Sequence, residues 1–128
     1  NKYDGLPQSF NDHFVFIAPN EGTDRITDFS VLVGNHGTLY FSHFTFGNHL
    51  AVGGANIGTL DASHFVAKDA GPIVDNSDFT TTSQRFLFNT ADHTLYYDAD
   101  GSGAAKAPIA MAVLEHVDVL QTADIHLI

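Results

Sequence analysis

The sequence predicts a mainly-β domain, and three observations carry this prediction. Short segments rich in β-branched and aromatic residues recur along the chain, and each stops at a cluster of Gly, Pro, Asn or Asp. No long segment repeats its apolar residues with the 3.6-residue period of an amphipathic helix. The acidic residues are 13 Asp and only 2 Glu, and Asp favours turns whereas Glu favours helices.

The first expected strands lie in the N-terminal third of the chain. Residues 13–17 are β-branched and aromatic and end at the turn cluster of residues 18–22. Residues 25–29 alternate polar and apolar side chains, which is the pattern of a half-buried strand. A third strand is expected at residues 38–44, after the Gly-rich residues 34–37.

A hairpin is expected in the C-terminal half. Residues 85–89 and 94–98 are aromatic segments that flank a tight turn at residues 90–93. The loop of residues 99–107 then leads to residues 108–115. That segment has helix-friendly residues, but its continuous apolar run and its leading Pro also fit a buried strand.

Two segments complete the expected fold. Residues 60–65 fit either one helical turn or a short strand, and residues 122–128 close the chain. Apolar residues of the strands are expected to seed the core, namely Phe14, Phe16, Phe29, Phe86, Phe88, Leu95 and Tyr97.

Composition limits the class of protein. A chain of 128 residues with 44% hydrophobic residues suits one domain with one core. The net charge of -10, with 5 Lys plus Arg, argues against a nucleic-acid partner. No apolar run reaches the roughly 20 residues that span a membrane. The absence of Cys excludes disulfides and thiolate metal sites. The chain opens without Met or a cleavable signal pattern, so we expect it to be a piece of a longer protein.

An acidic, Gly-rich loop follows the expected hairpin. Asp98, Asp100 and Ser102 stand at alternate positions beside Gly101 and Gly103. Alternate residues of such a loop can direct oxygens at one ion, which suits Ca²⁺ with its 6–8 oxygen ligands. The spacing is not that of an EF-hand. The alternative is an ordinary wide hairpin loop, in which Asp and Gly are common.

A second pattern lies near the N-terminus. Asp12 and Asp24 stand twelve residues apart, and each precedes or begins an expected strand after a turn. This spacing is typical of a parallel β-roll, in which successive coils share Ca²⁺. Asp28 is expected either to cap the next turn or to join the ion.

The sequence gives weaker support for zinc binding or catalysis. The 8 His residues do not form a zinc motif, and we expect them to be scattered over strands and loops, where they would make the charge pH-sensitive. No Ser occupies a G-x-S-x-G motif. Asp98 and Asp100 are more typical of an ion site than of a proton-sharing pair. This chain is therefore expected to be non-catalytic.

Several motifs in order along the chain resemble one family. They are the segment Asp-Arg-Ile-Thr-Asp-Phe at residues 24–29, the hairpin and loop of residues 85–103, the Ile/Ala-rich residues 109–112, and the acidic-hydrophobic residues 120–128. This series resembles the C-terminal region of RTX (repeats-in-toxin, hemolysin-type calcium-binding) secreted proteins, which include serralysin-like proteases and RTX adhesins.

The resemblance implies a calcium-binding, non-catalytic C-terminal domain of a bacterial protein that a type I secretion pathway exports. Such a protein is secreted, extracellular or on the cell surface, and its parent chain can carry an upstream catalytic domain. The exporter would read an uncleaved C-terminal tail, here Asp124 with Ile125, Leu127 and Ile128. Deleting this tail is expected to abolish export and to leave most of the fold.

The predicted architecture is the end of a parallel β-roll that runs into a compact β-sandwich-like C-terminal cap. Residues 1–128 form one domain, in which residues 1–30 are a degenerate β-roll end and residues 31–128 are the cap. One departure from the family is His93, at a turn position that relatives usually give to Gly.

The alternative function is an adhesin-like carbohydrate- or protein-binding module, or a subunit of an extracellular assembly. Tyr40 and Tyr96 exposed in a shallow groove would favour carbohydrate, whereas a large apolar patch would favour assembly.

Overall fold

The computed structural model describes residues 13–17, 22–26, 31–32, 35–36, 38–71, 74–103, 107–115, 117 and 119–128. Short strands dominate these ranges, and the helices in them are single turns. The protein is therefore mainly β, as the sequence predicts. Within these ranges, no helix has the length and apolar character needed to cross a membrane.

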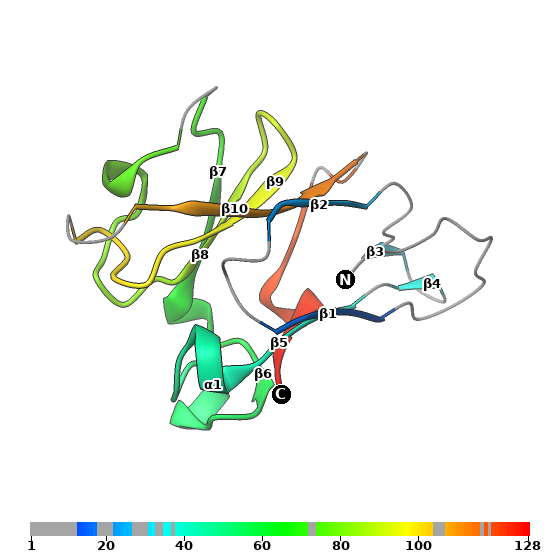
Figure 1. Cartoon of the computed structure of the whole chain (residues 1–128), viewed down its shortest axis with the longest axis vertical. Coiled ribbons are helices and arrows are strands. Elements are labelled where there is room, and N and C mark those ends of the chain that lie inside the picture. The colour runs from blue at the N-terminus through cyan, green and yellow to red at the C-terminus, as the bar shows by residue number, and fades with distance from the viewer. Residues whose placement is uncertain are drawn as a thin grey trace.

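The described strands form two mixed sheets and one short hairpin (Figure 1). Sheet A has the strand order β1 (His13–Phe16), β5 (Thr38–Phe41), β11 (Ile125–Leu127), β6 (Gly58–Thr59). Sheet B has the strand order β2 (Asp24–Ile26), β10 (Ile109–Leu114), β9 (Thr94–Tyr97), β8 (Phe86–Asn89), β7 (Phe65–Lys68). The hairpin pairs β3 (Val31–Leu32) with β4 (Asn35–His36). The helical turns are α1 (His43–Phe46) and the 3-10 turns η1 (Val52–Gly54), η2 (Ala62–His64), η3 (Asn76–Asp78) and η4 (Thr122–Asp124).

The predicted hairpin is confirmed at the centre of sheet B. β8 and β9 pair antiparallel, with Phe86 opposite Tyr97 and Asn89 opposite Thr94. His93 in the turn between them has a φ of 57°, the left-handed conformation that glycine adopts more readily. β10 follows as a strand rather than a helix, antiparallel to β9 and parallel to β2. Its apolar run is buried only in part, since Met111, Ala112 and Leu114 are buried whereas Ile109 is 40% exposed.

Two expected segments each divide into a turn and a strand. The strand expected at residues 38–44 ends at Phe41, because the chain bends at Ser42: its N–H donates to the Phe16 carbonyl, and its own carbonyl accepts from Phe46. In residues 60–65 both alternatives occur in succession, since η2 is followed at once by β7. The Asp61 carboxylate caps η2 by accepting the Ser63 N–H at 3.0 Å.

The C-terminal segment is an interior strand. β11 lies between β5, to which it is parallel, and β6, to which it is antiparallel. Ile125 and Leu127 are fully buried, and the Ile128 N–H donates to the Phe41 carbonyl at 2.9 Å. The sequence predicts that most of the fold survives without this tail, but its loss would remove the strand that joins β5 to β6.

Side chains from both sheets form one core. Phe16 stacks on Phe41 in sheet A, with ring centroids 4.8 Å apart, and Phe41 contacts Phe86 of sheet B at 4.7 Å. Phe46 of α1 packs edge-on against Tyr97 at 4.9 Å, and its carbonyl accepts the Tyr97 hydroxyl at 2.5 Å. The core residues predicted from the sequence are buried here, apart from Phe29, which lies outside the described residues. This aromatic cluster holds the two sheets together.

Candidate functional site

The acidic loop begins where β9 ends. The Asp98 N–H donates to the Arg85 carbonyl at 2.8 Å, which extends the β8–β9 pairing by one residue. Asp98 is completely buried, and its Oδ1 accepts the Asp100 N–H at 3.1 Å. The side chain therefore turns back into its own loop, as Asp commonly does in turns.

The loop is fixed against the turn that precedes β8. The Ser102 N–H donates to the Thr81 carbonyl at 3.1 Å. Gly101 is buried with a φ of +57°, and a Cβ atom there would lie 2.6 Å from the Gln84 carbonyl oxygen. Only glycine fits this approach, because both the backbone conformation and the lack of space exclude a side chain. The loop is thus packed between two parts of the chain and is not a free hairpin end.

Two carboxyl groups meet inside the loop. Asp98 and Asp100 lie within hydrogen-bonding reach of one another, and the Oδ1 atom of Asp100 is buried. The pKa of the Asp98 carboxyl is raised to about 6, chiefly by burial and also by the neighbouring Asp100 carboxyl. The Asp100 N–H and the positive charge of Arg85 partly offset it. Two carboxyl groups this close are stable when they share a proton or when a cation lies beside them.

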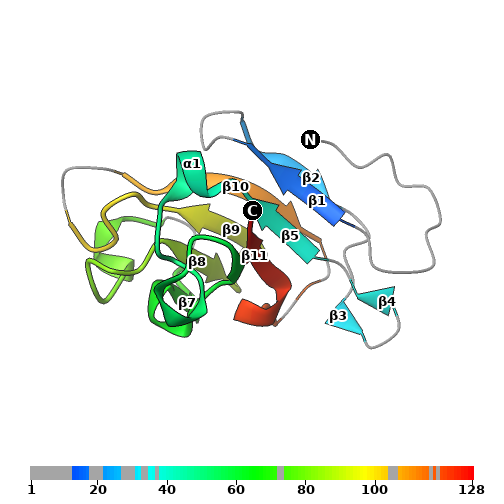
Figure 2. The ribbon, with the colours of Figure 1, turned by 90° about the horizontal axis from the view of Figure 1, so that it is seen from below.

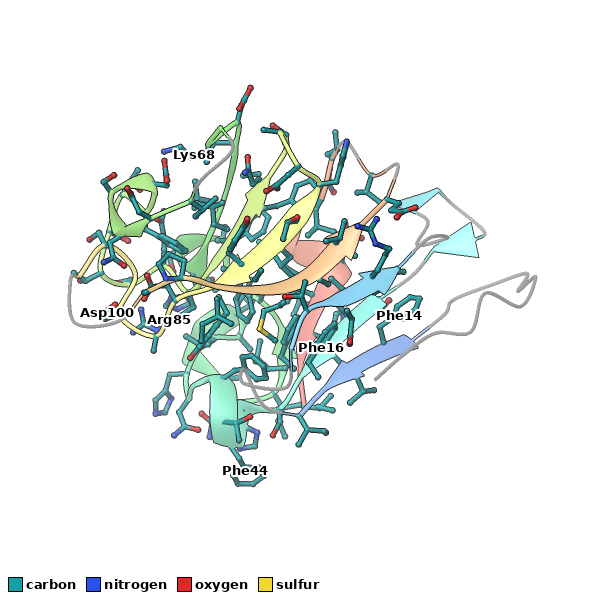
Figure 3. All side chains as sticks on the ribbon, turned by 45° about the horizontal axis from the view of Figure 1, so that its top comes forward. Phe14, Phe16, Phe44, Lys68, Arg85 and Asp100 are labelled. Atoms are coloured by element: carbon teal, nitrogen blue, oxygen red, sulfur yellow. The ribbon has the colours of Figure 1, made fainter. Side chains whose placement is uncertain are left out.

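The positive charge of Arg85 acts on this pair and lowers the pKa of Asp98. Figure 3 shows Arg85 and Asp100 at the same end of sheet B. The Arg85 guanidinium donates to the carbonyls of Thr82 and Gln84, the latter at 3.0 Å. Its hydrogen bonds to these carbonyls hold it beside the loop, and its charge reduces the negative potential there without cancelling it.

The chemistry of the donors fits a hard cation. Asp98 and Asp100 supply carboxylate oxygens, and the half-buried Ser102 adds a hydroxyl in the same loop. Oxygen donors of this kind suit Ca²⁺ better than zinc, which prefers nitrogen and sulfur. In the described part of the chain, no three His, Cys, Asp or Glu side chains converge as a metal group. A calcium ion here would therefore complete its shell with carbonyl oxygens or water.

The other acidic residues predicted as ligands do not join this loop. Asp24 begins β2 and lies opposite Ala112, within β10, whereas Asp98 directly follows β9 on the other side of β10. Asp12 and Asp28 lie outside the described residues. Of the predicted set, Asp98 and Asp100 contact one another, and Ser102 belongs to the same loop.

Several histidines have structural contacts. The Nδ1 atoms of four histidine rings lie 2.7–2.8 Å from backbone carbonyls, and these rings belong to His43, His49, His64 and His93. Each ring therefore joins its own segment to the backbone of another. They lie in separate elements, since His43 is in α1, His64 is in η2, and His49 and His93 are in a loop and a turn.

The two tyrosines considered for carbohydrate binding lie apart. Tyr40 is on β5 of sheet A, half-buried, with its ring against His126 at 5.6 Å. Tyr96 is on β9 of sheet B, and its hydroxyl donates to Asp92 at 3.0 Å. They therefore lie on different sheets.

Sequence reasoning did not identify the partners of the acidic loop. Thr81 and Gln84 supply the carbonyls against which Gly101 and Ser102 pack, about 20 residues earlier in the chain. Their residue types do not predict this contact with the loop, because the contact uses backbone atoms. The only sign of this contact in the sequence is Gly101, since the close approach to the backbone requires a glycine.

Comparison with known proteins adds no relative: no protein-family model, curated protein or solved structure matches the chain.

Proposed function

We propose that this chain is a calcium-stabilised, non-catalytic C-terminal domain of a secreted bacterial protein of the RTX type, exported by a type I pathway. The observation that carries the proposal is the pairing of Asp98 with Asp100 in a packed loop. Buried carboxylates destabilise the folded state unless a proton or cation compensates them. A calcium ion bound there would supply that compensation at neutral pH.

The arrangement of β1 and β2 supports the finer fold of the proposal, a β-roll end followed by a sandwich-like cap. These consecutive strands are the edge strands of different sheets, and each is parallel to its neighbour, β5 or β10. Figures 1 and 2 place them on the same side of the molecule. Consecutive strands of one β-roll coil alternate in this way between two sheets, with parallel neighbours from the next coil.

The charge of the chain supports a link between calcium and folding. A net charge of -10 destabilises the compact state through self-repulsion. A ligand that binds only the folded state stabilises it by about 2.7 kcal/mol when its free concentration is about 100 times Kd. The chain would thus stay loose where calcium is scarce and fold where it is abundant.

The position of the tail supports export before folding. Asp124, Ile125 and Leu127 are buried in the folded domain. An exporter that reads these residues would have to contact them while β11 is unpaired. Low calcium inside the cell would keep β11 unpaired for the exporter, and high calcium outside would favour the folded domain in which β11 is buried.

A calcium titration tests the proposed ion site. The thermal midpoint is measured in chelator, in millimolar Ca²⁺ and in millimolar Mg²⁺. We expect Ca²⁺ alone to raise it by about 10 °C, since about 2.7 kcal/mol shifts a domain of this size by that amount. The double variant Asp98→Asn with Asp100→Asn should lose the shift.

Asp69→Asn is the matched control, because it removes an exposed carboxylate and keeps an oxygen that accepts the Gly71 N–H. Its calcium shift should equal that of the wild type. No shift in the wild type, or an equal shift in the double variant, would refute this site.

Export is tested separately. The whole chain, fused behind a passenger protein, should appear in the medium when a type I exporter of the RTX class is co-expressed. The same fusion ending at residue 123 should stay in the cell. Equal secretion of both fusions would refute the tail assignment and would leave the calcium result unaffected.

A further inference from the structure

One long stretch of the sequence is free of charged side chains. Residues 29–60 contain no Asp, Glu, Lys or Arg, although the chain has 15 acidic residues and a net charge of -10. The described part of this stretch includes β5, α1, η1 and β6. Figure 1 shows α1 and β6 together at one end, beside the C-terminal end of β11.

Apolar side chains are exposed at this end. Phe44 on α1 is 85% exposed, and Figure 3 shows its ring directed away from the molecule. The other exposed apolar residues there are between 41% and 62% exposed, and with Phe44 they define the apolar end: Ile17, Phe44, Val52, Ile57 and Ile128. Exposed apolar patches of this kind mark interaction sites on soluble proteins.

Hydrogen bonds hold most of these residues next to one another. Thr45 donates its hydroxyl to the Ile17 carbonyl, and the His43 N–H donates to the Ile128 carbonyl at 2.9 Å. These bonds place the ends of β1 and β11 against α1, where Phe44 projects.

The second side of the apolar end comes from β6. Leu127 pairs with Gly58 in the antiparallel β6–β11 ladder, so Ile128 and Ile57 are the next residues in the same register. Val52 belongs to η1, which is closed by hydrogen bonds between Ala51 and both Gly54 and Ala55, on the same loop as Ile57. The apolar end is therefore one surface built from distant parts of the sequence.

We infer that the apolar end binds a second copy of this chain, with the same surface on both copies. The charge distribution supports this occupant. Two chains of net charge -10 repel one another over most faces, but the side chains that define the apolar end bring no carboxylate into the contact. Charges more than about 8 Å from the contact are screened at physiological salt. Two-fold pairing of identical surfaces is the commonest form of oligomer.

Other occupants fit the surface less well. The segment that forms most of it offers no cation to an anionic membrane or nucleic acid, and the net charge of the chain repels both. It also offers no carboxylate or cation to a charged protein partner. A second copy matches it, because apolar side chains on both copies leave water together.

The test is sedimentation velocity of the full chain over a range of protein and NaCl concentrations, in millimolar Ca²⁺. We expect a concentration-dependent dimer whose affinity increases with salt, since salt screens the repulsion between the two chains. Phe44→Asp and Ile57→Asp should each weaken association about 100-fold or more, because each buries a charge in the contact.

Val119→Asp is the matched control. Val119 is also exposed and apolar, but it precedes η4, at the opposite end of β11 from Ile128. This variant should associate as the wild type does. Circular dichroism and the thermal midpoint show whether each variant is folded, and Phe44→Ser replaces Phe44→Asp if the latter is not.

Three results would overturn the inference: a wild-type chain that stays monomeric at every concentration, a dimer that Phe44→Asp does not weaken, or a dimer that salt weakens. Flotation with phosphatidylcholine vesicles adds a fourth. A monomer that floats with these vesicles and loses this property on Phe44→Asp would assign the apolar end to lipid.

Discussion

Gly101 lies so close to Gln84 that a Cβ atom on the glycine would stand 2.6 Å from the Gln84 carbonyl oxygen. This approach fixes the acidic loop after β9 against the turn before β8. The loop that carries Asp98 and Asp100 is thus positioned by a backbone contact that neither of them makes. The loop is held against this turn by packing of Gly101 and by the hydrogen bond from the Ser102 N–H to the Thr81 carbonyl.

Replacing Gly101 by Ala should therefore destabilise the protein by about 3 kcal/mol, which combines the left-handed backbone conformation with overpacking. Gly53→Ala is the control, because Gly53 also has a positive φ of 76° but open space around its Cβ position. We expect it to cost about 1 kcal/mol. Urea denaturation measures both values, and equal costs would show that the contact with Gln84 is unimportant.

The stability of the metal-free protein should depend on the protonation of Asp98. Its pKa is raised to about 6 in the folded state, so the folded state holds this proton more tightly than the unfolded state does. The contribution of this proton to the free energy of unfolding is fully present below pH 3.8, the ordinary pKa of Asp, and is lost as the pH rises through 6. Wild type should thus gain about 2 kcal/mol over Asp98→Asn when the pH falls from about 7 to 4.5.

The comparison is made by urea denaturation in chelator at several pH values. Asp61→Asn is the control, because hydrogen bonds from Ser63 lower the pKa of Asp61 and place its titration below this pH range. Its difference from wild type should stay constant. A constant difference for Asp98→Asn as well would contradict the raised pKa.

Leu127 should be essential to sheet A. It is buried in β11, the strand between β5 and β6, and Leu127→Ala should cost about 3 kcal/mol through lost burial and the cavity left behind. The neighbouring Ile128 is 41% exposed, so Ile128→Ala should cost less than about 1 kcal/mol. Chemical denaturation distinguishes the two. Similar small costs would mean that β11 does not pair as described.

His93 combines a backbone cost with a side-chain contact. Its φ is 57°, and its Nδ1 lies 2.7 Å from the Val117 carbonyl. His93→Gly and His93→Ala both remove the ring, but only glycine also removes the cost of the left-handed conformation. The Gly variant should therefore be more stable than the Ala variant by about 1 kcal/mol in thermal or urea unfolding. The reverse order would show that the turn changes conformation when the ring is lost.

The sequence predicts those features that depend on neighbouring residues. The β8–β9 hairpin follows from two aromatic segments around a four-residue turn, and the positive φ of His93 follows from its place in that turn. The side chains of Asp98 and Asp100 share one loop because they are two residues apart. The mainly-β class is confirmed for the same reason, since strand and turn propensities are local.

The tertiary structure decides which distant segments meet. The sequence does not indicate that β11 lies between β5 and β6, that Gly101 packs on the backbone of Gln84, or that Ile17, Phe44 and Ile128 share one surface. Each of these contacts joins residues whose local patterns are satisfied in many arrangements. The observed arrangement is selected by burial of a common aromatic core and by backbone hydrogen bonds between strands far apart in the chain. Neither of these is encoded in any single segment.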